Sequence, residues 1–221
     1  MAQQILIIGL GQFGMSLART LAAKGAEILA IDSNRSLVEE AATFVTEALV
    51  MNAVEESELA KLEPGKRDSA ICAIGDESKE SSIICTALLR QMGNPHIVAR
   101  ANDKLHHRIL QLVGAHEIIN PELEFGIRFA NRLLYRDIIA ENVVGTGESL
   151  QLTEIKIQPS MIGKNLIELA LPKKFGIIVA GIRRAEIAKI VTPSPTSPLE
   201  EGDTLIVVSN ESAIQSFVKG V

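Results

Sequence analysis

The sequence predicts a doubly wound α/β fold, in which helices cover both faces of a parallel sheet, followed by a small α+β domain. Two observations predict this class. Apolar runs alternate with amphipathic helical patterns from Gln4 to Ile119, which is typical of βαβ units. After Glu148, shorter alternating segments take over, which favours a second domain. The 221 residues, 47% of them hydrophobic, suffice for two cores.

The first half of the chain predicts strands and helices in strict alternation. Strands are expected at Gln4–Ile8, Glu27–Asp32, Glu47–Met51, Ser69–Ile74, His96–Arg100 and Glu117–Ile119. Helices are expected at Phe13–Lys24, Ser36–Phe44, Glu55–Leu62, Glu77–Met92 and Asp103–Val113. Ser or Asp opens several of these helices, and Gly25, Gly93 and Gly114 follow three of them, as is typical of helix ends.

A longer helix is expected from Glu122 to Ala140. Phe125, Phe129, Leu133 and Leu134 repeat there on a three-to-four-residue rhythm. In a monomer such a stripe would lie on the sheet. If both faces of the sheet are already covered, the stripe crosses to another subunit or to the next domain, and we favour this second interpretation.

The last part of the chain predicts the small α+β domain. We expect strands at Leu150–Ile157, Gly176–Ile182, Glu186–Val191 and Leu205–Ser209, helices at Lys164–Leu171 and Glu211–Lys219, and a turn at Pro193–Pro198. Gly145-Thr146-Gly147-Glu148 separates this part from the long helix. The predicted organisation is therefore residues 1–121, a helical dimerisation or linker segment at 122–148, and residues 149–221.

Composition excludes several classes of protein. No apolar run reaches the roughly 20 residues of a membrane span, and the first residues lack a cleavable leader pattern. The net charge of −5, the absence of Trp and the single Tyr argue against nucleic-acid binding. Cys72 and Cys85 fall in apolar segments, which suits buried thiols in a reducing compartment rather than a metal or redox pair. We expect a soluble protein.

The turn Gly9-Leu10-Gly11-Gln12-Phe13-Gly14 carries the strongest functional signal. It joins a predicted strand to a predicted helix, and Asp32 ends the next strand. In this context GxGxxG is a dinucleotide-binding, Rossmann-like fingerprint: the glycines permit a tight turn, phosphate approach and close helix packing. A tight turn without a ligand is the alternative for Gly11. We expect an adenine nucleotide whose phosphates meet the start of the helix.

Other residues that follow the predicted strands should line the same site, because ligands of such sheets bind at the carboxyl ends of the strands. Asp32 would accept the ribose hydroxyls, which favours NAD(H), ATP, ADP or AMP over an NADP-type ligand; its alternative is a helix cap. The further candidates are Ser33, Asn52, Ala53, Ala73, Ile74, Gly75 and Arg100, followed by Asp76 in the same loop.

Each of these candidates also has a structural interpretation. Asn52 could cap the helix near Glu55, small residues at Ala73 to Gly75 could simply close a strand, and Arg100 could be a solvated rim charge. His106 and His107 are interpreted as surface or packing residues, since the sequence offers no further ligands in a chelating arrangement.

Across essentially its whole length the chain resembles the RCK (regulator of K⁺ conductance) proteins of the Ktr/Trk potassium-uptake type. The resemblance rests on motifs in both halves. They are Ile7–Gly14, Ala30–Asp32, Asn52-Ala53 with Glu55, Glu56 and Leu59, Ala73–Gly75, Gly114-Ala115 and Ile118–Glu122, then Ile162–Leu166, Phe175-Gly176, Ile182–Arg184 and Leu199–Leu205. The second set distinguishes these proteins from dehydrogenases.

The resemblance implies a regulatory protein that is not an enzyme. By similarity Gly9 to Gly14, with Asp32, Asn52, Ala73, Gly75 and Arg100, would bind the nucleotide. Glu122 aligns with a carboxylate that, in some relatives, helps hold a divalent or monovalent cation; its alternative is a first-turn acid that favours the helix dipole. Many relatives have Arg at the position of Gln12, so the choice between ATP/ADP and NAD(H) is open here.

The second domain resembles the carboxy-terminal RCK module, which in some relatives binds cyclic di-AMP. The matching stretch includes Ile162, Asn165, Leu166 and Ala170 to Phe175, with Pro172 at a commonly basic or polar position. A packing helix with solvated Lys173 and Lys174 is the favoured interpretation.

The resemblance also implies partners and a mechanism. Homodimers formed through the helix after Pro121 would assemble into a ring, an octamer by analogy, on the cytoplasmic face of a membrane-embedded potassium transporter subunit. Nucleotide exchange would then change the shape of the ring. Two alternatives remain open: an NAD-linked oxidoreductase, and a nucleotide sensor that acts on another soluble partner. Against the enzyme, all four histidines lie between His96 and His116, outside the second domain.

Overall fold

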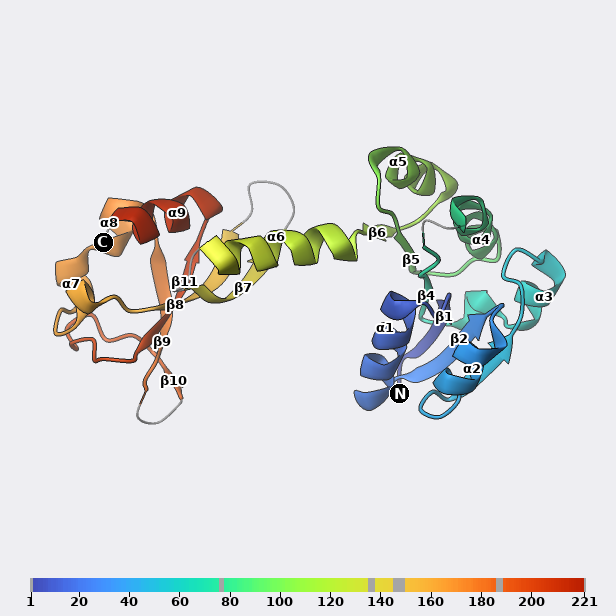
Figure 1. The fold of residues 1–221 in the computed structure, drawn as a ribbon, viewed down its shortest axis with the longest axis horizontal. Helices are drawn as coiled ribbons and strands as arrows, with labels where there is room; N and C mark the ends of the chain where they lie inside the picture. The colour runs from blue at the N-terminus through green and yellow to red at the C-terminus, as the bar shows by residue number, and fades with distance from the viewer. Residues whose placement is uncertain (1, 76–77, 135–137, 145–149, 186–188, 221) are drawn as a thin grey trace. The chain divides into compact units, whose positions relative to one another are not determined.

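The computed structural model describes residues 2–75, 78–134, 138–144, 150–185 and 189–220. The chain divides into two compact units, Met1–Glu124 and Phe125–Val221 (Figure 1). In the described residues no helix has both the length and the apolar character that a membrane crossing requires.

The first unit is built on a six-stranded parallel sheet with the order β3-β2-β1-β4-β5-β6. Its strands are β1 (Gln4–Ile8), β2 (Glu27–Asp32), β3 (Glu47–Val50), β4 (Ser69–Cys72), β5 (Ile97–Arg100) and β6 (Glu117–Ile119). The chain reverses its direction of winding between β1 and β4, which is where doubly wound folds bind ligands. The predicted fold class is confirmed.

Helices cover both faces of this sheet (Figure 1). They are α1 (Gln12–Ala23), α2 (Arg35–Ala41), α3 (Glu56–Lys61), α4 (Lys79–Gln91) and α5 (Lys104–Val113), with a short 3₁₀ turn η1 (Pro64–Lys66). Alternate residues of β1 enter two cores: Ile5 and Ile7 pack with α1 and α2, while Leu6 and Ile8 pack with α3, α4 and α5. Burial on both faces explains why β1 is a continuous apolar run.

The helices differ in whether a side chain accepts hydrogen bonds from the N–H groups at their N-termini. Asn34 caps α2 through the Ser36 N–H, and Asp103 caps α5 through the His106 N–H at 2.8 Å. No side chain caps α1, whose N-cap is Gly11. The alternative role of Asn52 as a helix cap is wrong: α3 begins after Glu55, and the Asn52 side chain accepts the Val54 N–H at 3.3 Å.

The second unit contains a five-stranded antiparallel sheet with the order β10-β9-β11-β8-β7. Its elements are β7 (Ile138–Val144), β8 (Leu150–Lys156), η3 (Pro159–Met161), α7 (Leu166–Leu169), α8 (Leu171–Phe175), β9 (Ile178–Arg183), β10 (Ile190–Val191), β11 (Thr204–Ser209) and α9 (Glu211–Gly220). Phe217 of α9 packs edge-on against Phe175 in the core of this unit.

Two of the helices predicted from the sequence differ in the structure. The helix α6 (Pro121–Leu134) stops before Ala140, and the segment beyond it forms β7, which pairs with β8. Ile138, Ile139, Val143 and Val144 are β-branched, which favours a strand once a partner strand is available. The predicted turn at Gly145 to Glu148 lies outside the described residues.

The single helix predicted at Lys164–Leu171 is instead two short helices, α7 and α8. They are separated at Ala170, which has φ 48°. Pro172 accounts for the break, because its ring would clash with a carbonyl one turn earlier in a continuous helix.

A buried carboxylate organises the loops of the second unit. Asp203 is 1% exposed. Its Oδ2 lies 2.6 Å from Arg184 Nη1 and accepts the Glu200 N–H at 2.9 Å, while Oδ1 accepts the Ala185 N–H at 3.3 Å. One side chain therefore joins the end of β9 to the turn before β11. Removing it would leave the Arg184 charge without its carboxylate and would remove the acceptor of the Ala185 and Glu200 N–H groups.

Replacement of Asp203 by Ala should lower the free energy of unfolding by about 3 kcal/mol, because breaking a buried ion pair leaves an uncompensated charge. Urea denaturation followed by far-ultraviolet circular dichroism would measure it. The matched control is Glu201→Ala, since Glu201 is exposed in the same turn. Equal effects of the two substitutions would contradict a special role for Asp203.

Candidate functional site

The carboxyl ends of β1 to β5 open onto a cavity of about 650 Å³. Of the predicted binding residues that the structure describes, all except Gly14 line it, and so does Glu122. The lining residues are Ile8, Gly9, Gly11, Gln12, Phe13, Ile31, Asp32, Ser33, Asn34, Leu37, Met51, Asn52, Ala53, Val54, Ala73, Ile74, Gly75, Ser78, Ser81, Arg100, Asn102 and Glu122. The fold thus gathers residues that lie far apart in the sequence.

The glycine turn is tightly packed against its neighbours at two positions. Gly9 has φ +94°, and a Cβ built there would lie 3.1 Å from the Ile74 N atom. A Cβ on Gly14 would lie 1.9 Å from the Gly9 carbonyl oxygen. Gly14 therefore lies beneath the cavity wall, where it lets α1 pack directly on the turn.

Gly11 differs from both of these glycines. Its φ of −60° and ψ of −176° are open to any residue, and a Cβ there would meet no atom of the described chain within 4 Å. Neither backbone conformation nor packing within the chain requires a glycine at this position. The open space faces the cavity, which Gly11 lines.

The first turn of α1 also faces the cavity, through Gln12 and Phe13. No side chain caps this helix end, and its first turn contains no acidic residue. The N–H groups and the positive end of the helix dipole are therefore directed at whatever occupies the cavity, and they favour an anion. Gln12 is exposed and adds hydrogen-bonding capacity without charge.

Asp32 fixes the turn from the end of β2. Its Oδ2 accepts the Leu10 N–H and its Oδ1 accepts the Asn34 N–H, both at 2.7 Å. The helix cap of α2 is Asn34, so the alternative of Asp32 as the cap is wrong. Each carboxylate oxygen retains lone pairs for a further donor from the cavity.

The opposite wall of the cavity combines small residues with one cation. A Cβ on Gly75 would lie 3.4 Å from Arg100 Nη1. Arg100 is the last residue of β5; its side chain is 17% exposed, and its Nη2 forms an ion pair with Glu122 at the start of α6. Arg100 is therefore a largely buried, paired charge rather than a solvated rim charge.

Several lining residues were not singled out by sequence reasoning. They are Ile8, Ile31, Leu37, Met51, Val54, Ser78, Ser81 and Asn102. The rule that strand ends share one edge could have found Asn102, two residues beyond β5. Ser78 and Ser81 come from the start of α4, a signal that a search limited to strand ends misses. Asp76, predicted beside them, lies outside the described residues.

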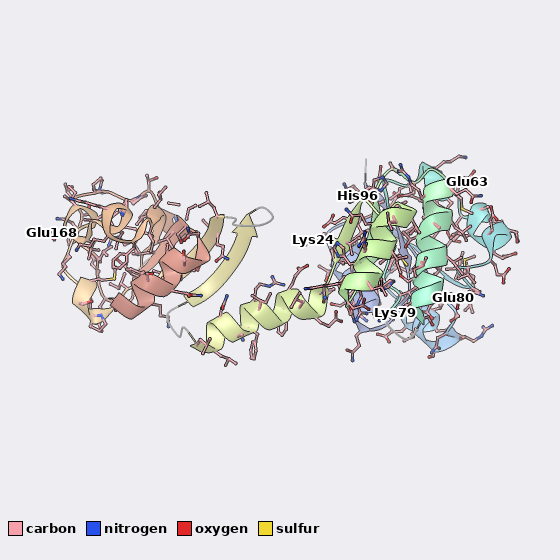
Figure 2. The ribbon with its side chains drawn as sticks, turned by 90° about the horizontal axis from the view of Figure 1, so that it is seen from above. Lys24, Glu63, Lys79, Glu80, His96 and Glu168 are labelled. Atoms are coloured by element: carbon pink, nitrogen blue, oxygen red, sulfur yellow. The ribbon has the colours of Figure 1, made fainter. Side chains whose placement is uncertain are left out.

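An ion pair links the starts of α4 and α5, beside residues that line the cavity. Lys79 Nζ lies 2.6 Å from Asp103 Oδ2. Figure 2 shows Lys79 at the start of α4, with Glu63 near the other end of this helix. The hydrogen bond from Lys79 lowers the pKa of Asp103 to about 2. The stability from this pair is therefore complete above the pKa of the unfolded carboxyl and is lost only as the pH falls towards 2.

No cluster of three or more His, Cys, Asp or Glu residues suited to a metal ion occurs in the described residues. His106 is buried on α5 and His107 is exposed, as their packing and surface interpretation predicts. Cys72 and Cys85 are both fully buried. A hydrogen bond with Cys85 lowers the pKa of Cys72 to about 7. Glu122 is the single predicted metal ligand that lines the cavity.

Comparison with known proteins identifies both halves of the chain. Residues 5–121 match the TrkA-N domain, and residues 152–219 match the TrkA-C domain. The Ktr system potassium uptake protein A of Vibrio alginolyticus is 36% identical over 220 residues, which cover 99% of this chain and 98% of that protein. The protein of the same name from Bacillus subtilis is 30% identical, with 97% and 95% covered.

Among solved structures, the GsuK channel bound to NAD superposes with a TM-score of 0.65. The identity is 18%, and the match covers 99% of this chain but 40% of the channel chain. This likeness establishes the fold of the chain, which spans about two fifths of the channel's length.

The three glycines of the turn should respond differently to substitution. Gly14→Ala should lower the free energy of unfolding by about 3 kcal/mol, because its Cβ meets the Gly9 carbonyl. Gly11→Ala should cost less than about 1 kcal/mol, the loss expected when Ala replaces Gly at an N-cap. Urea denaturation followed by circular dichroism without ligand measures both. Similar losses for the two variants would contradict this account of the turn.

Proposed function

This chain belongs to the family of proteins built from a TrkA-N and a TrkA-C domain, and on that premise we propose that it is the nucleotide-binding regulatory subunit of a potassium uptake system. The whole-length similarity to the Ktr system potassium uptake protein A carries the proposal. Residues 1–121 would bind the nucleotide, residues 149–221 would form the regulatory domain, and residues 122–148 would link and dimerise. The partner is a membrane-embedded potassium transporter subunit.

An adenine nucleotide is the ligand that the cavity fits. Its phosphates would occupy the space beside Gly11 and receive the N–H groups at the start of α1. Its ribose hydroxyls would donate to Asp32, whose carboxylate is already held in place by Leu10 and Asn34. A cavity of about 650 Å³ is within the usual range for small-molecule sites.

The charges of the described lining residues bear on which adenine nucleotide binds. Asp32 and Glu122 are anionic, Arg100 is cationic and already paired, and Gln12 is neutral. The site therefore offers little net charge to a triphosphate, and NAD(H) or ADP suits it better than free ATP. A divalent cation bound to its phosphates would raise the affinity of the site for ATP.

Glu122 alone would not hold such a cation. It contributes one carboxylate, which is paired with Arg100, whereas Mg²⁺ and Ca²⁺ take six or more oxygen ligands. We propose Glu122 as a cation ligand only together with nucleotide phosphate oxygens, and we propose no further protein ligand.

Pairing through α6 is the proposed route to a dimer. None of the residues of α6 is buried. Its exposed large apolar side chains are Leu123, Phe125, Ile127, Phe129, Leu133 and Leu134, and the rings of Phe125 and Phe129 stack at 5.7 Å. A helix of 14 residues is marginal in water unless its apolar face is covered. A second copy of α6 would cover it, and dimers would assemble into a ring, an octamer by analogy.

The proposed mechanism is a change of conformation without chemistry. Nucleotides that bind two shapes of the assembly with different affinities would shift the population between them and so bias the transporter. Hydride transfer fits less well. The described lining residues include no His, Lys, Tyr or Cys, and Asp32 and Glu122 are both already engaged.

Gly11→Ala should abolish nucleotide binding in a folded protein, because its methyl group fills the space left for phosphate. Calorimetry with NADH, ADP and ATP would measure affinity for the wild type and the variant. A second measurement is growth at low K⁺ of cells that lack other potassium uptake. Wild-type protein expressed with a Ktr-type membrane subunit should support this growth, and the Gly11→Ala variant should not. A wild type that binds no adenine nucleotide would overturn the proposed function.

Phe129→Asp should raise the dissociation constant of the dimer by about 100-fold. A symmetric dimer contains Phe129 twice, so the substitution removes two aromatic side chains from the proposed interface. Light scattering and sedimentation over a range of concentrations would measure it. Asn131→Asp adds the same charge on the polar side of α6 and should leave the dimer intact. A wild type that stays monomeric at high concentration would refute the pairing.

A further inference from the structure

The contact between Arg100 and Glu122 joins the cavity to the helix that leaves the first unit. Arg100 ends β5, and Glu122 is the second residue of α6. Glu124, two residues further on, is the last residue of the first unit. The ion pair therefore adds a side-chain contact between β5 and the first turn of α6, which follows β6 in the chain.

Arg100 retains hydrogen-bonding capacity that Glu122 does not use. Its side chain is largely buried, its Nη2 binds Glu122, and its Nε is buried with no hydrogen-bond partner in the described part of the chain. A guanidinium has five N–H donors in a planar fork that matches phosphate geometry. A buried donor without a partner is costly, so an anion in the cavity would be favoured beside it.

A ligand phosphate and Glu122 would compete for the same cation. Both are anions that bind the guanidinium fork, but a phosphate in the cavity also receives the N–H groups of α1. The Glu122 carboxylate is 53% exposed, so it returns to water at little cost once released. Exchange of partners is therefore feasible.

The start of α6 remains capped when the ion pair opens. Asn120 Oδ1 accepts the Leu123 N–H at 3.0 Å, independently of Arg100. Release of Glu122 would thus detach the first turn of α6 from β5 without unwinding it.

We propose that the Arg100–Glu122 ion pair is a ligand-operated latch: an anionic nucleotide phosphate takes Arg100 from Glu122 and so releases the side-chain contact between β5 and the first turn of α6. This inference rests on the proposed function, because it assigns regulation to the same cavity. It makes Arg100 a ligand-binding residue and Glu122 an internal competitor of the ligand.

The test is a double-mutant cycle on the full chain, with ADP as the probe and EDTA present to exclude divalent cations. Glu122→Gln removes the competitor and should raise the affinity for ADP by about tenfold. Glu124→Gln, which removes the same charge in the same helical turn, should change it less than about twofold. Arg100→Gln should lower the affinity, and Glu122→Gln should have no further effect in that background.

The last arm separates competition from repulsion. If Glu122 merely repels the ligand through space, Glu122→Gln will raise the affinity in the Arg100→Gln background as well, and the latch is refuted.

The outcomes also distinguish the two proposals. Wild-type protein that binds no adenine nucleotide overturns the proposed function and the latch together. Wild-type protein that binds ADP, with an affinity that Glu122→Gln leaves unchanged or lowers, overturns the latch alone.

Discussion

The first unit depends on one close approach of backbone to backbone. Because Gly14 lacks a Cβ, α1 begins directly against the Gly9 carbonyl, closer than any side chain would permit. That approach aims the helix end at the edge of the sheet, and the hydrogen bond from Leu10 to Asp32 holds the turn against β2. The position of this helix therefore places its uncapped N-terminus at the cavity, where its N–H groups favour an anion.

Local patterns in the sequence were sufficient for the sheet and for most of the cavity. Strand ends converge on one edge in any doubly wound fold, so residues such as Asp32 and Ala73 could be placed from topology alone. The hydrogen bonds of these residues could not be predicted. Whether the Asp32 carboxylate accepts the Leu10 N–H or binds solvent depends on the conformation of the folded turn. The motif predicts a packing role for one glycine and an open space for another, and the structure adds how tight the packing is: a Cβ on Gly14 would meet the Gly9 carbonyl, whereas one on Gly11 would meet no described atom within 4 Å.

The sequence failed where the outcome depends on partners far along the chain. Residues 138–144 continue the apolar character of α6, and they become a strand because β8 pairs with them. The pairing of Arg100 with Glu122 likewise links residues that belong to different elements. Neither could be inferred from periodicity, which reports the neighbours of a residue along its own element.

The uncovered surface of α6 also has a consequence for how the protein behaves when dilute. If a second copy of the chain covers the apolar face of α6, dimerisation stabilises the folded state. The free energy of unfolding then rises with protein concentration. Newly synthesised chains would then be prone to aggregate until they dimerise, because the apolar face of α6 is exposed. Subunits of related sequence made in the same cell would compete for that surface, so relative synthesis rates, and not affinity alone, would set the composition of the assemblies.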